Sequence, residues 1–479
     1  MKSKWCRGLW TACVSVWALS SWAAGGYHLT VTAPDLKNAK MFLGQYYMGK
    51  LYSKDSTLLD SKGVGTFASK DSILPEGLYV LYYSDSRYFD ILLGRDQNIT
   101  VKVDTTDLPH RLQFGGAPET RDFYDYTSFL MERQKKNAQL SQQRKEITEQ
   151  TPVDSARLRQ VDEASKVLND EVTARQQQLM DRYPDGMLGL FLRGLTHPDL
   201  PEYDIPAGVS NPDSLKRALQ YGFVRDHYMD NLDLSDERTF RTPYIRNALD
   251  TYVNRILVQQ YDSIIPSALR LVERSRGNAH CFQNVANYFL DYAVKSTMMG
   301  IDKLTVELGY RYYLSGAATW ADSTLKANIE SEVHKIETSL VGMKAHNVAL
   351  CDTTGRYRKL YELCGEQITI LFFFVPGCGH CKKATPKARD FYEKYKDDPR
   401  INLIACYLLE DEKEWRDFIK EYHTECFTNV WDPKRTSYYW HWFDTSSTPM
   451  IYVLKDDHTI LAKKIDVESL EMIAKYELK

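Results

Sequence analysis

The sequence predicts a multidomain chain with an N-terminal β-sandwich, a central all-α domain and a C-terminal α/β domain. At 479 residues the chain is too long for one ordinary hydrophobic core. The pattern of apolar residues changes to helical spacing near residue 117 and to alternating strands and helices near residue 346. With 43% apolar and 26% charged residues, the composition is that of a globular protein.

The first 23 residues have the features of a secretory signal peptide. Lys2, Lys4 and Arg7 precede an apolar run, and Ser21-Trp22-Ala23 supplies the small residues of a cleavage site. Because the run is too short for a comfortable membrane span, we expect an exported protein, with a retained anchor as the alternative. The net charge of -3 argues against nucleic acid as a partner, because nucleic-acid binding needs a basic face.

Residues 25–112 are expected to form the β-sandwich. Short runs such as "YHLTVTA", "GLYVLYYS" and "NITVKVD" are rich in aromatic and β-branched residues. Turn-forming stretches such as "DSKGVG" and "GRDQN" separate them. Short strands with regular turns and no helical stretch are typical of a small antiparallel sandwich.

Residues 117–345 are expected to form the all-α domain. Apolar residues recur there at spacings of three and four, and Pro- and Gly-containing connectors divide the segments. The first two segments are long and strongly charged. They favour a bundle with solvated outer faces, and a coiled-coil arm is the alternative.

Residues 346–479 alternate between strands and helices. "ITILFFFV" at 368–375 is a continuous apolar run, typical of a strand buried on both faces. A helix follows it near Cys378, and "INLIACYLL" is a second buried strand. We expect an opening hairpin and then the order β-α-β-α-β-β-α, which is an α/β domain with a mixed sheet.

The stretch Cys378-Gly379-His380-Cys381 lies at the start of that helix. Free amides and the helix dipole there favour a thiolate at Cys378, and thiolate is the attacking species in disulfide exchange. Cys381, one turn further, is placed to resolve the resulting mixed disulfide. Gly379 keeps the approach open, and His380 is expected to support the thiolate as a polar or cationic group.

The motif and its surroundings resemble the thioredoxin superfamily. "CGHCKKATP" is similar to the active-site stretch of protein disulfide isomerases, with Pro386 where the superfamily kinks its helix. Thr448-Pro449 resembles the superfamily's cis-proline loop, which implies that both support the active site. The layout of three domains resembles multidomain TlpA/ResA-like thiol:disulfide oxidoreductases of Gram-negative bacteria. That resemblance implies a periplasmic location and a thioredoxin-like fold for residues 346–479.

The sequence also departs from the superfamily pattern. Pro376-Gly377 stands where a tryptophan is usual, which opens the face beside the cysteines. Phe372 occupies the position of thioredoxin's buried carboxylate, so the usual proton acceptor for the second cysteine is missing. Three acidic residues after the second buried strand are candidates for this role, although a solvated loop is the favoured interpretation; they are Glu410, Asp411 and Glu412. His346, at the entry to the domain, is interpreted as structural.

The expected function is that of an exported thiol-disulfide oxidoreductase that reduces or isomerises disulfides in envelope proteins. Cys378 is the nucleophile and Cys381 the resolving thiol. The expected partners are envelope proteins with disulfides or thiols and a membrane or soluble electron donor, and homodimerisation through the helical domain is left open. No cofactor is expected, and the alternative is a non-catalytic envelope scaffold with a thioredoxin-like adaptor.

A structural metal site is disfavoured by the spacing of the cysteines. Zinc usually takes four ligands in two paired sets, and no second C-x-x-C is present. Cys351 and Cys406 are expected to be buried small hydrophobes. Cys364 is interpreted in the same way, and a Cys351–Cys364 disulfide is the alternative.

Overall fold

The computed structural model describes residues 26–84, 87–104, 112–150 and 153–479, so the signal peptide expected at 1–23 lies outside the described residues. The chain divides into two compact units. The first contains the described residues up to Thr196 and Arg238–Arg246, and the second contains His197–Glu237 and Asn247–Lys479. The helical region expected at 117–345 is therefore shared between both units. The three domain boundaries stay predictions.

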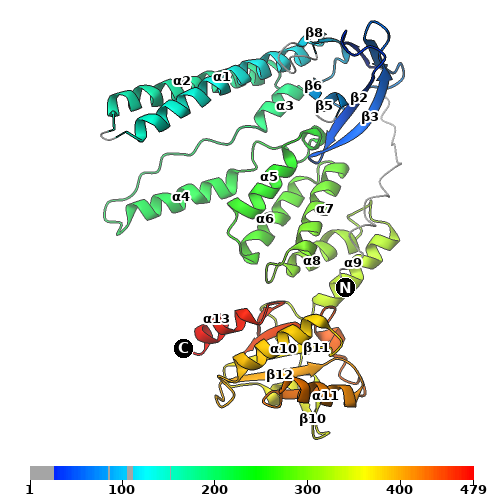
Figure 1. Ribbon diagram of the computed structural model, residues 1–479, viewed down its shortest axis with the longest axis vertical. Coiled ribbons are helices and arrows are strands. Elements are labelled where there is room, and N and C mark those ends of the chain that lie inside the picture. The colour runs from blue at the N-terminus through cyan, green and yellow to red at the C-terminus, as the bar shows by residue number, and fades with distance from the viewer. Residues whose placement is uncertain (1–25, 85–86, 105–111, 151–152) are drawn as a thin grey trace. The chain divides into compact units, whose positions relative to one another are not determined.

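The first unit contains the β-sandwich that the sequence predicts (Figure 1). It is not wholly antiparallel as expected, because His28–Thr32 pairs in parallel with Asn98–Val103. Its sheets have the orders β4-β1-β7-β8 and β3-β2-β5-β6. The strands are β1 His28–Thr32, β2 Lys40–Tyr47, β3 Lys50–Leu58, β4 Val64–Ala68, β5 Gly77–Ser84, β6 Arg87–Leu93, β7 Asn98–Val103 and β8 Leu112–Gly116. Alternate residues of β7 are buried, and Val31, Leu43 and Leu81 from both sheets are fully buried in one core. Three strands were not expected. β3 has mostly polar residues that lie exposed at a sheet edge, and β4 and β8 have only five residues each.

Two long helices follow the sandwich in the same unit. α1 (Pro118–Thr148) and α2 (Ser155–Arg182) lie side by side (Figure 1). Phe123, Tyr126 and Leu179 are buried with the short helix α3 (Met187–Arg193), whereas most other residues of the pair are exposed or half-buried. The bundle expected from the sequence is therefore wrong for these helices, which form a two-helix arm. Their polar outer faces do not distinguish a bundle from an arm.

The second unit begins with the remaining helices of the central region. They are α4 Pro212–His227, α5 Ile245–Thr251, α6 Tyr261–Arg274, α7 Ala279–Lys295, α8 Asp302–Leu308 and α9 Ser323–Ile336, with π-helical turns at Tyr252–Ile256 and Gly309–Leu314. A 3-10 turn at Glu237–Arg241 precedes α5, and most of this turn and the first two residues of α5 belong to the first unit. α6 and α7 each bury an apolar face, as amphipathic helices do. Among the described residues, no helix combines the length and apolar character that crossing a bilayer requires.

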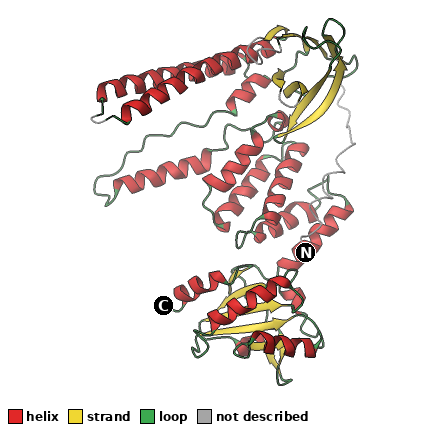
Figure 2. Cartoon of the chain, in the orientation of Figure 1, coloured by secondary structure: helices red, strands yellow, loops and turns green. Residues whose placement is uncertain are grey.

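The C-terminal part of this unit is a seven-stranded mixed sheet with the order β10-β9-β13-β12-β11-β14-β15 (Figure 2). Its strands are β9 Ala349–Asp352, β10 Tyr357–Lys359, β11 Ile368–Phe374, β12 Ile401–Tyr407, β13 Thr428–Trp431, β14 Met450–Lys455 and β15 Ile460–Lys463. Its helices are α10 Gly379–Tyr392, α11 Glu412–Tyr422, α12 Tyr439–Trp442 and α13 Glu468–Glu477, with a 3-10 turn at Leu360–Leu363. β11 pairs in parallel with β12 and antiparallel with β14. The expected order lacked β13 and α12, which have only four residues each.

Both faces of this sheet are covered. Phe372 and Phe374 of β11 face a core shared with α10, α11 and α13. Leu371 and Phe373 face a second core, shared with α12 and the segment before β9. All seven residues of β11 are buried, which confirms a strand covered on both faces.

A buried ion pair joins β15 to the preceding helices. Lys463, which is 1% exposed, has its Nζ 2.5 Å from Oδ2 of Asp302 in α8. Neither charged group has a hydrogen bond to any other described residue. Burial lowers the pKa of Lys463, and the carboxylate opposes this shift. Losing one partner would therefore leave an uncompensated charge in the interior.

We expect Lys463→Met to lower the free energy of unfolding by about 3 to 5 kcal/mol, because it strands the Asp302 carboxylate. Urea denaturation of the purified chain measures this loss. Lys413→Met is the matched control: it removes an ion pair from α11 whose lysine is 87% exposed, and it should cause no measurable change. Adding Asp302→Leu to Lys463→Met should restore stability. Equal effects of the two lysine variants would contradict the prediction.

Candidate functional site

The two cysteines of the C-G-H-C stretch lie where β11 ends and α10 begins. β11 occupies the interior of the sheet, and functional sites of α/β domains usually lie at the carboxyl edge of such strands. Cys378 is the N-cap residue of α10, and Cys381 lies one turn inside the helix. The side chain of Cys378 is partly exposed, whereas that of Cys381 is fully buried. Only the first sulfur can therefore meet another molecule.

The helix start lowers the pKa of the Cys378 thiol. Partial burial is the largest single effect and by itself would raise this pKa. Hydrogen bonds from the Thr448 side chain, from the backbone amide and thiol of Cys381 and from the His380 amide together outweigh it. Amides of the first helical turn have no partner within the helix, so they are available to a thiolate.

The second thiol has the opposite shift. Burial raises the pKa of Cys381 to about 11, and contact with Cys378 acts in the same direction. Hydrogen bonds from Val375 and Thr448 reduce the shift without reversing it. The pair thus combines a thiol that ionises readily with one that keeps its proton near neutral pH.

The loop before β14 brings Thr448 against the exposed sulfur. Cys378 Sγ donates a hydrogen bond to the Thr448 carbonyl oxygen at 3.2 Å. The Thr448–Pro449 peptide bond is cis, as the resemblance implies. A carbonyl can accept only from the protonated thiol, whereas the Thr448 hydroxyl can donate to the thiolate. One residue therefore contacts the sulfur in both protonation states.

The surface beside the sulfur is open. A Cβ atom added at Gly377 or Gly379 would meet no atom within 4 Å, so neither glycine is required by crowding. Pro376, by contrast, is buried. The His380 side chain is exposed, and it is the backbone amide of this residue that bonds to Cys378. The support expected from His380 is therefore provided by its main chain.

Among the residues that the structure describes, no carboxylate takes the place of the buried acid that thioredoxins have. Phe372, 1% exposed, lies in the same core as Cys381. Asp411 accepts the Glu414 amide at the start of α11. Glu410 and Glu412 form exposed ion pairs with arginines at 3.3 and 2.8 Å. These acids therefore belong to a solvated loop and a helix cap, which is the interpretation that the sequence favoured.

The other cysteines of this domain are free thiols. Cys351 packs in the core on the α10 face of the sheet, and Cys364 packs against the core on the opposite face. The sheet lies between them, so they are not placed to form the disulfide that the sequence left open. Cys406 is buried, and burial raises its pKa. Within the described parts of the chain, no group of three His, Cys, Asp or Glu side chains is placed to hold a metal ion.

One residue near the site was missed by the sequence analysis. Asp444, 2% exposed, accepts hydrogen bonds from the backbone and side chain of Ser446, in the loop that leads to Thr448. The signal was present, because an aspartate side chain often accepts the backbone amide two residues further on, which forms an Asx-turn. Without the fold, nothing indicated that this turn lies next to Cys378.

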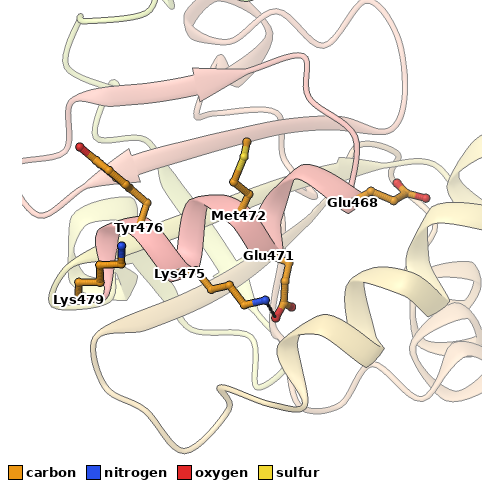
Figure 3. Close-up of a pocket in the computed structure, with 6 residues that line it drawn as sticks. All are labelled: Glu468, Glu471, Met472, Lys475, Tyr476 and Lys479. Atoms are coloured by element: carbon orange, nitrogen blue, oxygen red, sulfur yellow. Dashed lines mark ion pairs between the residues drawn. The ribbon is translucent and has the colours of Figure 1, made fainter.

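A shallow hollow on the outer face of α13 is a separate feature (Figure 3). It is lined by Glu468, Glu471, Met472, Lys475, Tyr476 and Lys479. Met472 and Tyr476 are 70% and 73% exposed, and Glu471 pairs with Lys475 at 3.4 Å. The hollow contains no thiol or histidine, so it has no part in the chemistry of the cysteines.

Comparison with known proteins places the C-terminal domain in a family. Residues 365–460 match the model of a family described as thioredoxin-like. A thioredoxin-like protein from Bacteroides caccae is similar over 59% of this chain and 99% of its own, with 18% identity and a TM-score of 0.45. No curated protein matches the chain.

Two further solved structures are similar to the C-terminal part alone. One is a domain of a protein described as a possible thiol-disulfide isomerase from Cytophaga hutchinsonii, with 36% identity, 29% of this chain and 94% of its own covered, and a TM-score of 0.27. The other is the thioredoxin domain of a thiol-disulfide oxidoreductase from Bacteroides vulgatus, with 20% identity, 29% and 97% coverage and a TM-score of 0.27.

The family assignment depends on the matched residues and on the fold, because all three TM-scores are below 0.5. The matched range contains both cysteines and the cis Thr448–Pro449 bond. It also contains the parallel pair β11 and β12 with α10 between them. The chain therefore belongs, through its C-terminal domain, to the thioredoxin-like family.

Proposed function

We propose that the protein is an exported thiol-disulfide oxidoreductase that reduces or isomerises disulfides of envelope proteins through Cys378 and Cys381. The observation that carries this proposal is the placement of two thiols at one helix start, where Cys378 caps the helix at the surface and Cys381 is fully buried one turn inside it. Cys378 is accessible and has a lowered pKa, while Cys381 is buried with a pKa of about 11. Two packed structural thiols would both be buried, and both pKa values would be raised.

In the first step, the Cys378 thiolate attacks one sulfur of a client disulfide. A mixed disulfide forms, the client S–S bond breaks, and the other client sulfur leaves as a thiolate. The open surface at Gly377 and Gly379 admits an extended client segment. The Thr448 loop lies beside the reacting sulfur and lines this approach.

In the second step, Cys381 loses its proton and attacks Cys378. A Cys378–Cys381 disulfide forms and the client is released with two thiols, so two electrons have passed to the client. A two-electron thiol donor, soluble or membrane-bound, restores the dithiol. In isomerisation, a client thiol attacks the mixed disulfide instead, and no net electrons are transferred.

The location and partners belong to the same proposal. The signal features of residues 1–23 support export, and the periplasm is the compartment that the TlpA/ResA resemblance implies. Disulfide- or thiol-containing envelope proteins are the proposed clients. The exposed helices α1 and α2 offer a surface for homodimerisation, which would place two active sites in one assembly.

We expect Cys378→Ser to abolish insulin reduction in a dithiothreitol-coupled assay, because the serine hydroxyl does not ionise near neutral pH. Cys406→Ser is the matched control: Cys406 is buried away from the helix start, and this variant should retain activity. Equal activity of wild type and Cys378→Ser would reject the enzyme and favour the non-catalytic scaffold.

We expect Cys381→Ser to accumulate mixed disulfides, because Cys378 can still attack but no thiol releases it. Non-reducing gels and mass spectrometry of envelope extracts would detect these adducts. The double variant Cys378→Ser/Cys381→Ser is the control and should trap nothing. If the single variant also trapped nothing, client exchange at Cys378 would lose its support.

We expect alkylation of the reduced protein to separate the two thiols by pH. The rate follows the thiolate fraction, so it rises with pH and levels off above the pKa. For Cys378 the midpoint should lie below the value of about 8.5 for a free cysteine. Cys381 should stay unreactive until the pH approaches its pKa of about 11. Iodoacetamide labelling with peptide mapping measures both, and a Cys378 midpoint at or above that of a free-cysteine peptide would contradict the assignment.

A further inference from the structure

One buried carboxylate holds the loop that leads to Thr448. Asp444 Oδ1 accepts the Ser446 amide at 3.1 Å and the Ser446 hydroxyl at 2.5 Å. Its Oδ2 lies 2.9 Å from Nζ of Lys464, the residue that follows β15. The same side chain therefore fixes the turn before Thr448 and ties it to the edge of the sheet.

The main chain of Asp444 is held as well. Its amide donates to the Tyr452 hydroxyl oxygen at 2.8 Å, and this hydroxyl lies 3.3 Å from the Asp444 carbonyl oxygen. Tyr452, in β14, is fully buried. Its hydroxyl also lies 3.2 Å from Oγ of Ser339, which follows α9 and is fully buried too. A residue outside the thioredoxin-like domain thus contacts the hydroxyl that holds Asp444.

The segment before Asp444 has two further contacts with residues that precede β9. Thr338 Oγ1 donates to the His441 carbonyl oxygen at 2.8 Å. The His346 ring stacks on Trp442 with centroids 3.5 Å apart and an interplanar angle of 4°, which agrees with a structural role for this histidine. The chain from residue 441 to 444 is therefore held by residues that precede the first strand of the thioredoxin-like domain.

These contacts lie close in sequence to Thr448, the residue that touches the reacting sulfur. Three residues separate Asp444 from Thr448, whose carbonyl oxygen is 3.2 Å from Cys378 Sγ. Thr448 is therefore in direct contact with Cys378, and a displacement of this loop would alter that contact.

We propose that Asp444 and Tyr452 are positioning residues that hold Thr448 against Cys378, and that through Tyr452 the segment after α9 sets the reactivity of this sulfur. The catalytic consequence rests on the proposed function, but the placement of Thr448 does not. Burial raises the pKa of Asp444, yet Lys464 and Ser446 outweigh it and the net pKa is lowered. The carboxylate therefore remains charged at neutral pH, and Asp444→Asn removes its attraction for Lys464 while keeping its size.

The test is the alkylation rate of Cys378 at pH 7 in the reduced full-length protein, with unfolding measured in parallel. Displacement of Thr448 removes the side-chain hydrogen bond that lowers the pKa of Cys378. Asp444→Asn should therefore slow alkylation at least about threefold, which corresponds to a shift of about half a pKa unit. Tyr452→Phe and Ser339→Ala should slow it in the same direction. Ser446→Ala, a change at an exposed residue, should give a smaller decrease in the alkylation rate. It replaces Asp444→Asn in the test if that variant does not fold.

Asp432→Asn is the matched control. Asp432 is 3% exposed and also organises a loop, since it accepts the Thr436 and Ser437 amides at 3.2 and 2.8 Å. It has no contact with the Thr448 loop among the described hydrogen bonds and ion pairs, so this variant should lose stability without slowing Cys378.

The outcomes separate the possible failures. If Asp444→Asn slows alkylation no more than Asp432→Asn does, the positioning role is wrong and Asp444 is merely structural. If Tyr452→Phe and Ser339→Ala both leave the rate unchanged, the link to the segment after α9 is wrong. Alkylation needs no client and no turnover. A wild type without insulin-reducing activity, whose Cys378 still responds to Asp444→Asn, would therefore refute the proposed function and support the positioning role.

Discussion

The site depends on the burial of β11 on both faces of its sheet. A strand enclosed by two cores can leave the sheet only at its ends, so its carboxyl end delivers Cys378 to one fixed edge. The helix that starts there presents unpaired amides to the sulfur, and its first turn carries Cys381 back into the core. The difference between the two thiols follows from this geometry. Cys378 lies beside the unpaired amides of the helix start, and Cys381 is buried in the core.

In the proposed reaction, the site has to work without the acid found in thioredoxins. With Phe372 in its place, the core beside Cys381 is apolar, and burial keeps that thiol protonated. In the proposed reaction, the proton of Cys381 would pass to groups that approach from the open side, such as the departing client thiolate and water.

Much of this arrangement could be predicted from local patterns. A continuous apolar run, a C-x-x-C at the following helix start and a proline directly before a later strand are each visible within ten residues, and the structure brings them together. β13 and α12 were missed because segments of four residues carry too little periodicity to identify. β3 was missed because an exposed edge strand lacks the alternation of apolar and polar residues by which a half-buried strand is identified. The contact of Asp444 with Tyr452 was beyond reach because it depends on sheet register, which no local pattern records.

The contacts between the thioredoxin-like domain and the helices before it bear on why such a domain stands at the end of a long chain. A domain tethered by a flexible linker would share few buried polar groups with its neighbour. Here Lys463 pairs with Asp302 in the interior, and Ser339 contacts Tyr452 where neither side chain is exposed. Buried polar contacts require their partners at fixed positions, since either group alone would be left without one. The helices before the domain are therefore joined to it by buried polar groups, and we propose that a movement of the segment after α9 reaches the Thr448 loop through Tyr452 and Asp444.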